Sequence, residues 1–200
     1  LDEEEELVSG VSAAQTIKEL KIEIQTLDNL VEEAERIRFS GIDKKWDELR
    51  DLLISEKLNQ KGKLRKLIIF TEHRDTLIYL TDKLRSYFGT DDSVVNIYGG
   101  MQRDERKNNQ DKFKNNKNSF ILVCTDAASE GINLQFTNLM INYDLPWNPN
   151  RLEQRFGRIH RIGQELVCHV WNLVANETRE GSVFERLLEK LEEARVALGG

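Results

Sequence analysis

The sequence of 200 residues predicts an α/β fold in which helices cover both faces of a parallel sheet, preceded by an α-helical appendage. After residue 64, short apolar runs alternate with segments of helical periodicity, as in strands that are joined by helices. The run SFILVCT at 119–125 has no polar alternation, which is typical of a strand buried on both faces. The first third has no such strands, and its apolar residues follow helical spacing instead.

Residues 1–62 are predicted to form a helical hairpin that serves as an insertion or brace. A first helix is expected from about 11 to 38, on the strength of apolar residues at helical spacing. These residues are Ile17, Leu20, Ile24, Leu27, Leu30, Val31 and Ala34. Gly41 interrupts the pattern, and a second helix is expected over 44–56. The acidic stretch LDEEEE at the start follows no strand, so we interpret it as a solvated charge run.

Residues 63–176 are predicted to form the α/β domain, and residues 177–200 a C-terminal packing helix. In chain order the expected elements are strand 66–70, helix 73–89, strand 94–100, helix 103–114, strand 119–125, strand 138–146, helix 149–162, strand 167–175 and helix 181–198. Ligands of such sheets bind beyond the carboxyl ends of the strands, so the turns after the strands are where a site is expected.

Composition and charge exclude several classes of protein. The net charge of −6 argues against a general polyanion-coating protein. Residues 1–60 carry 8 basic and 16 acidic side chains, whereas the remainder carries 21 basic and 19 acidic, so basic patches are expected only in the latter. No apolar run is long enough to span a membrane and no signal peptide is present, which favours a cytoplasmic protein without membrane partners. Cys124 and Cys168 lie in apolar runs without metal-ligand spacing, so neither a metal site nor a disulfide is expected.

The stretch RLEQRFGRIHRIGQ at 151–164 concentrates arginines on a predicted helix. At about 100° per residue, three apolar side chains share a face that is expected to pack on the sheet. They are Leu152, Phe156 and Ile159. Three polar side chains share a nearly opposite face that is expected to point outward: Gln154, Arg158 and Arg161. Two interpretations are open: a solvated face with salt bridges, or guanidinium groups that bind phosphate. Only Glu153 is a nearby acidic residue in the sequence that could form salt bridges with these arginines, which favours phosphate binding.

The segment QRFGRIHRIGQ closely resembles motif VI of superfamily 2 helicases, in the form found in SWI/SNF-like (RapA-like) DNA translocases. The resemblance implies a RecA-like fold for the domain. It also implies that Arg158 and Arg161 act as arginine fingers on ATP held by a neighbouring RecA-like domain, and that Gln154 and Arg155 start the motif. An arginine finger stabilises the charge that develops as the γ-phosphoryl group departs.

Companion motifs follow in the order that the family has. LIIFTEHRDTLIYL resembles motif IV, YGGMQRDER resembles the glycine turn after the next strand, and VCTDAASEGINLQFTNLMINYDLPWNP resembles motif V with its extension. The resemblance implies contacts with the nucleic-acid backbone by Thr71, Gly99, Gly100 and Thr125. It implies contacts with the nucleotide by Gly131 and Asn133. The alternative interpretation of Gly99-Gly100 is a plain tight turn, and that of Trp147 is a core position. His73 and His160 lie in the recognised motifs, but neither has a neighbouring nucleophile or metal ligand in the sequence.

The sequence lacks the phosphate-binding loop G-x-x-x-x-G-K-[ST] and an acidic residue placed to hold Mg²⁺. The resemblance covers about 64 to 175 and only the second of two RecA-like lobes. It therefore implies that ATP and Mg²⁺ are held mainly by an N-terminal lobe that precedes Leu1 in the full-length protein, and that this chain alone does not hydrolyse ATP. A start at Leu1 rather than Met also suggests a piece of a longer protein.

The leading hypothesis is the second motor lobe of an ATP-dependent DNA translocase or helicase, which is expected to contact the backbone of duplex DNA. Backbone contacts predict weak sequence specificity and strong salt dependence. The segment after motif VI favours a prokaryotic source and a nucleoid-associated, cytoplasmic location. Two alternatives stay open: an RNA helicase lobe of the same superfamily, and a non-catalytic RecA-like module that docks a partner.

Overall fold

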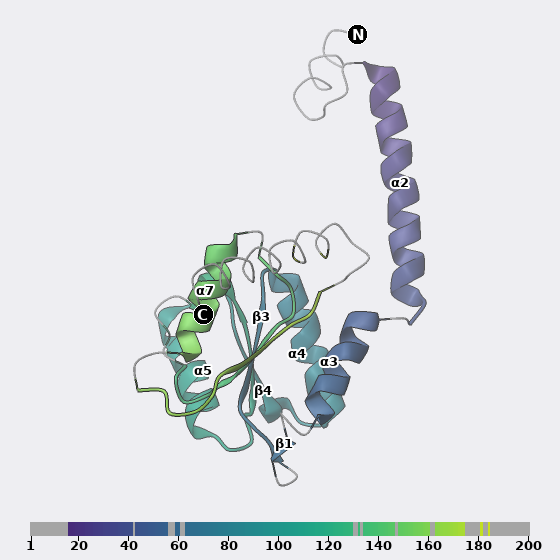
Figure 1. Cartoon of the computed structure of the whole chain (residues 1–200). Coiled ribbons are helices and arrows are strands. Elements are labelled where there is room, and N and C mark those ends of the chain that lie inside the picture. Colours follow the sequence, from purple (N-terminus) through teal and green to yellow (C-terminus); the bar gives the residue numbers. More distant parts are fainter. Residues whose placement is uncertain are drawn as a thin grey trace, which may run out of the picture. The chain divides into compact units, whose positions relative to one another are not determined.

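The structure is a computed structural model that describes residues 16–174, except 42, 56–58, 61–62, 130–131, 133, 147 and 161–162, together with 181 and 184. It divides into two compact units, Leu1–Lys44 and Lys45–Gly200. Figure 1 shows a single long helix in the first unit and an α/β domain in the second. The predicted acidic lead-in and the predicted helix at 181–198 lie almost entirely outside the described residues.

The first unit contains α2, Ile17–Phe39, which ends one residue beyond the predicted helix. Its N-terminus has a capping box, in which the Thr16 hydroxyl accepts from Glu19 N and the Glu19 carboxylate accepts from Thr16 N. The chain leaves the helix through Gly41, whose φ of +73° is favourable only for a residue without a Cβ. No residue of α2 is buried, so capping and helix propensity rather than core packing define this element.

The next helix, α3 (Lys44–Ile54), belongs to the core of the second unit from Lys45 onward. Leu49 and Leu53 lie one turn apart and are buried against the sheet. The sequence prediction grouped this helix with the preceding one as a separate hairpin, and this grouping differs from the structure. Its two buried leucines explain the difference, because they complete one face of the α/β core.

The sheet of the second unit has five parallel strands in the order β4-β5-β3-β6-β7. The strands are β3 (Leu67–Thr71), β4 (Val94–Ile97), β5 (Ile121–Thr125), β6 (Leu139–Asn142) and β7 (His169–Asn172). All five predicted strands are present, and the predicted α/β class is confirmed. Between α3 and β3, the short strands β1 (Asn59–Gln60) and β2 (Lys63–Leu64) form a separate antiparallel pair.

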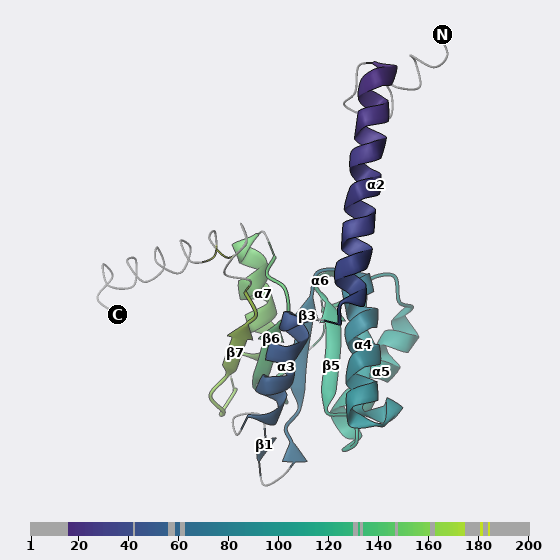
Figure 2. The ribbon, with the colours of Figure 1, turned by 90° about the vertical axis from the view of Figure 1, so that its right-hand side faces the viewer.

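Helices cover both faces of this sheet, with α3 and α4 on one side and α5 and α7 on the other (Figures 1 and 2). The remaining helices are α4 (Arg74–Phe88), the 3₁₀ turn η1 (Asp91–Ser93), α5 (Arg103–Asn115), α6 (Asp126–Ser129) and α7 (Pro149–Ile159). Alternate strand residues feed two apolar clusters: Ile69 and Val123 face α4, whereas Ile68 and Leu122 face α5 and α7. Burial on both faces explains why the strands read as continuous apolar runs.

No helix in the described part of the chain is long and apolar enough to cross a membrane.

Candidate functional site

The carboxyl ends of three adjacent strands bring polar side chains to one edge of the sheet. β3 ends at Thr71, β5 at Thr125 and β6 at Asn142. β3 lies between the other two in a parallel register, so these ends lie side by side. α6 follows β5 directly, and α7 packs against both α6 and β6. A ligand of a parallel α/β sheet is expected at this edge.

Arg155 of α7 is buried at this edge with 1% of its side chain exposed. Its Nε and Nη2 donate to the two carboxylate oxygens of Asp126 at 2.6 and 2.7 Å, a bidentate pair. Its Nη1 donates to Asn142 Oδ1 at 3.0 Å and to the backbone oxygen of Asp144 at 2.8 Å. The guanidinium carbon lies 5.3 Å from the ring centre of Phe70. We name Arg155, Asp126, Asn142 and Asp144 the arginine hub.

The arginine hub connects the ends of four strands. The carboxylate of Asp144 accepts from the Thr71 hydroxyl and, at 2.7 Å, from Glu72 N, so it holds the turn after β3. Asn142 Nδ2 donates to Asn172 Oδ1 at 2.7 Å at the end of β7. Together with Asp126 after β5, these contacts attach α7 to β3, β5, β6 and β7 through polar groups.

The predicted packing face of α7 is only partly correct. Ile159 is buried and Leu152 is half-buried, but Phe156 is 36% exposed and stacks on His160 with ring centres 4.9 Å apart. Arg155 takes the buried position because Asp126 and Asp144 supply compensating charge there. These carboxylates lie on other elements, so the expectation that the arginines have few anionic partners is wrong for Arg155.

Arg151 also has anionic partners, but its own side chain is exposed: its Nη1 lies 3.2 Å from Glu72 Oε1 and 4.0 Å from Asp126 Oδ2.

Arg158 is half-buried, and its Nε is buried without a hydrogen-bond partner among the described residues. Its backbone oxygen accepts from Leu134 N at 3.2 Å, which fixes the end of α7 to the loop after α6. Gln154 is exposed. The other predicted nucleotide contacts, Arg161, Gly131 and Asn133, lie outside the described residues.

The predicted nucleic-acid contacts divide into two sets. Thr71 is fully buried and its hydroxyl donates to Asp144, so its side chain is not accessible in this conformation. Thr125 Oγ1 accepts from Gly99 N at 3.2 Å, which joins the turn after β4 to the end of β5. A Cβ on Gly99 would lie 3.2 Å from Ala127 Cβ, and Gly100 has a φ of +87°, so both glycines are required by this turn.

A family model matches most of the residues described above. The helicase conserved C-terminal domain matches residues 44–163, which are more than half of the chain and include all four residues of the arginine hub. The chain belongs to the helicase C-terminal domain family.

Curated proteins that are similar to this helicase C-terminal domain include an ATP-dependent helicase and RNA polymerase-associated proteins. An uncharacterized ATP-dependent helicase YqhH of Bacillus subtilis (strain 168) is 48% identical over 126 residues, which are 63% of this chain and 22% of that protein. The RNA polymerase-associated protein RapA of Vibrio parahaemolyticus is 32% identical over 154 residues, 74% of this chain and 16% of that protein. The chain therefore spans about a fifth of the length of these relatives.

Solved structures agree with this assignment. The C-terminal part of the Fun30 ATPase domain superposes with a TM-score of 0.61 at 26% identity and covers 70% of this chain and 44% of that one. A Sulfolobus solfataricus SWI2/SNF2 ATPase core in complex with dsDNA gives a TM-score of 0.53 at 30% identity and covers 62% and 25%. The predicted RecA-like, SWI/SNF-like assignment is confirmed.

Two features of this helicase C-terminal domain escaped sequence reasoning. One is the arginine hub, whose partners lie 11 to 29 residues away from Arg155 in the chain. The other is Arg74, the first residue of α4, whose guanidinium carbon lies 4.5 Å from the ring centre of Tyr98. Tyr98 immediately precedes the Gly99-Gly100 turn. The contact between Arg74 and Tyr98 could be recognised only from the fold, because the two residues lie on different elements.

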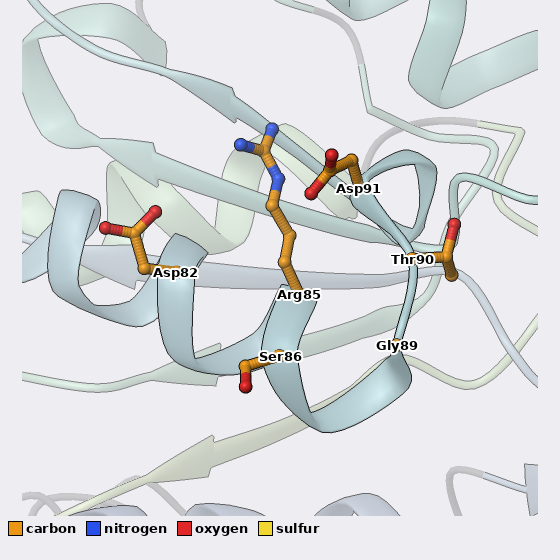
Figure 3. A pocket seen from close by; sticks show the side chains of 6 residues that line it. All are labelled: Asp82, Arg85, Ser86, Gly89, Thr90 and Asp91. Atoms are coloured by element: carbon orange, nitrogen blue, oxygen red, sulfur yellow. The ribbon is translucent and has the colours of Figure 1, made fainter.

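The helicase C-terminal domain also has a pocket of about 440 Å³ that is remote from this edge (Figure 3). Its lining residues are Asp82, Arg85, Ser86, Gly89, Thr90 and Asp91. They lie at the end of α4 and before β4, at the amino-terminal end of that strand rather than at the carboxyl ends, and they include none of the predicted site residues.

Metal and thiol chemistry receive no support from the described part of the domain. It contains no group of three or more His, Cys, Asp or Glu side chains that could hold a metal ion. Burial raises the pKa of the Cys124 thiol despite the nearby positive charge of Arg155, so this thiol stays protonated.

Proposed function

We propose that this chain is the second motor lobe of an ATP-dependent DNA translocase, and that it supplies arginine fingers to ATP bound on the first lobe. The observation that carries the proposal is the contrast between the arginines of α7. Arg155 is fully paired and Arg151 forms a surface ion pair, but no described residue binds the Arg158 side chain. A half-buried guanidinium with an unused donor is suited to an anion from outside the described chain.

The surroundings of Arg158 support this role. A Cβ on the adjacent Gly157 would meet no atom within 4 Å, so the helix surface there has room for an approaching group. The arginine hub fixes α7 to the sheet, which reduces the conformational entropy that is lost when Arg158 binds a phosphate. We also propose, from the family resemblance, that the same ATP is contacted by Arg161, Gln154, Gly131 and Asn133.

We assign the DNA contacts to the turn after β4 and the end of β5. Gly99, Gly100 and Thr125 lie together there, next to the N-terminus of α5, which has no side-chain cap. Free amide groups at a helix N-terminus favour an anion such as a backbone phosphate. Because Thr71 is buried, the contact after β3 is assigned to its exposed neighbours, of which Arg74 beside Tyr98 is the cationic one.

The test compares two arginines of the same helix in the full-length protein. Arg158→Ala is expected to lower kcat for ATP by about 10³-fold or more, as loss of an arginine finger does. Arg151→Ala is the matched control, since its exposed guanidinium makes only ion contacts with Glu72 and Asp126 that are worth about 0–1 kcal/mol, and its kcat is expected to stay within about threefold of wild type. Phosphate release at saturating ATP and DNA measures both, and a full kcat in Arg158→Ala contradicts the proposal.

Two alternatives are decided by simple controls. An RNA helicase lobe predicts that RNA stimulates ATP turnover more than duplex DNA does, whereas the dsDNA complex of the similar SWI2/SNF2 ATPase core favours the reverse. A non-catalytic docking module predicts that neither nucleic acid stimulates turnover and that Arg158→Ala has no effect.

A further inference from the structure

Among the described arginines of α7, only Arg155 is fully buried, and its hydrogen bonds leave it a single orientation. An arginine side chain has five N–H donors. Four hydrogen bonds to Asp126, Asn142 and Asp144 use donors on all three nitrogens, and Nη2 also lies 3.7 Å from the Asp144 carboxylate. A planar group held on both edges fixes the rotation and translation of α7 at this point.

The carboxylate that holds Arg155 is covalently next to a proposed DNA contact. Asp126 directly follows Thr125, whose hydroxyl oxygen accepts from Gly99 N at 3.2 Å. Asp126 is also the first residue of α6, so its backbone position depends on the end of β5. A phosphate that binds the Gly99–Thr125 turn and shifts Thr125 therefore also shifts Asp126, because one peptide bond joins the two residues.

The other end of the connection is Arg158. It lies three residues after Arg155 on the same helix, about 4.5 Å along the axis at 1.5 Å per residue. The helix transmits a shift of Arg155 to Arg158 because its backbone hydrogen bonds make it rigid over one turn. No described residue ties the Arg158 side chain elsewhere, so its position follows the helix.

We propose that Arg155 and Asp126 form a positioning pair that couples the DNA-binding turn to Arg158. Neither side chain contacts ATP or DNA. A phosphate at the Gly99–Thr125 turn sets the position of Asp126, the bidentate contact sets that of Arg155, and α7 then places Arg158 for its role on ATP. This inference rests on the proposed function, in which Arg158 reaches ATP and the Gly99–Thr125 turn reaches DNA.

The geometry determines which substitutions are informative. Arg155→Ala would remove the guanidinium that binds both carboxylate oxygens of Asp126, whose side chain is 16% exposed, and is expected to damage the fold. Arg155→Lys keeps the positive charge but replaces the planar fork with one ammonium group, which cannot bind both oxygens of Asp126 along two parallel bonds. Asp126→Asn keeps the size of the side chain and removes one strong acceptor. These two variants therefore change the positioning contact with the smallest change in packing.

The experiment measures ATP turnover of the full-length protein with and without duplex DNA. Arg155→Lys and Asp126→Asn are each expected to keep DNA-independent turnover within about threefold of wild type and to lower the stimulation factor by about tenfold, within the usual range of coupling between two sites. The double variant is expected to show the same loss as either single variant, because both interrupt one contact.

A matched control separates positioning from stability. Lys66 is another cation that joins distant segments, because its ammonium donates to the backbone oxygens of Phe113, Asn116 and Ser119. Lys66→Met is expected to lower the melting temperature, as the hub variants do, but to leave the stimulation factor unchanged. A loss of stimulation in Lys66→Met equal to that in Arg155→Lys overturns the proposal, because stability alone would then explain it.

The remaining outcomes distinguish this inference from the proposed function. If Arg158→Ala abolishes turnover but Arg155→Lys is stimulated like wild type, the positioning pair is wrong and the arginine finger stands. If Arg155→Lys lowers stimulated and DNA-independent turnover by the same factor, coupling is also excluded. If Arg158→Ala retains full turnover, the arginine finger itself fails and the pair has no group to position.

Discussion

Arg155 and Arg158 show how one residue type acquires different roles through what lies beside it. Both are arginines of the same helix, three residues apart, and the resemblance to motif VI implies the arginine-finger role for Arg158. The structure shows that Arg155 finds carboxylates from two other elements, whereas Arg158 finds none among the described residues. A helical wheel describes only the helix itself, so it cannot show which arginine has a partner on another element.

Asp92 offers a residue-scale prediction for pH dependence. Its carboxylate accepts from the Lys112 ammonium at 2.7 Å, and this hydrogen bond together with the charge of Lys112 lowers the pKa of Asp92 below the ordinary 3.8. A lowered carboxyl pKa contributes stability above the ordinary pKa, and the contribution is lost as the pH falls through the lowered value. The pair is exposed, so the contribution to stability is small.

We expect Lys112→Met to raise the pKa of Asp92 towards its ordinary value. NMR titration of the Asp92 carboxyl in the 200-residue chain measures this directly. The stability difference between wild type and Lys112→Met is expected to be present near neutral pH and to be lost as the pH falls through the lowered pKa of Asp92. An unchanged Asp92 titration would show that the ion pair does not form in solution.

The elements divide into those that sequence periodicity predicts and those that need tertiary information. β3, β5 and β6 were predictable because each is a short apolar run buried on both faces, whereas the edge strand β7 is only half-buried. α7 was predicted to start at Pro149, as observed. The assignment of α3 was not predictable, because its buried Leu49 and Leu53 look the same in sequence as the exposed apolar residues of α2. Only the sheet beneath α3 distinguishes the two helices.

This difference predicts that a leucine-to-alanine substitution lowers the free energy of unfolding strongly in α3 and hardly at all in α2. Leu53→Ala removes a side chain that is 2% exposed and is expected to lower the free energy of unfolding by about 2–5 kcal/mol. Leu27→Ala in α2, where the leucine is 54% exposed, is expected to change it by less than about 0.5 kcal/mol. Urea unfolding of the 200-residue chain, followed by far-UV circular dichroism, measures both. A loss of about 2 kcal/mol or more in Leu27→Ala would show that α2 packs against other residues in solution.

At the scale of the whole molecule, the proposed function makes this domain one half of a reaction centre. The described edge has a cation without a partner in Arg158, a rigid support for it in the arginine hub, and a glycine turn suited to phosphate. The chain has no phosphate-binding loop of the form G-x-x-x-x-G-K-[ST]. Arginine fingers stabilise charge on a nucleotide that other groups must hold in place, so this set of residues requires a second surface for catalysis.

The 200-residue chain alone is therefore expected to show no ATP turnover above background, with or without duplex DNA. Without a loop that cradles the β- and γ-phosphates and places Mg²⁺, Arg158 has no oriented γ-phosphoryl group to act on, and a lone guanidinium contributes little to phosphoryl transfer. Phosphate release by wild type and by Arg158→Ala at equal concentration provides the comparison, with both expected at the level of buffer. Turnover by wild type that Arg158→Ala removes would show that these residues bind and hydrolyse ATP unaided, and the two-lobe account would then be wrong.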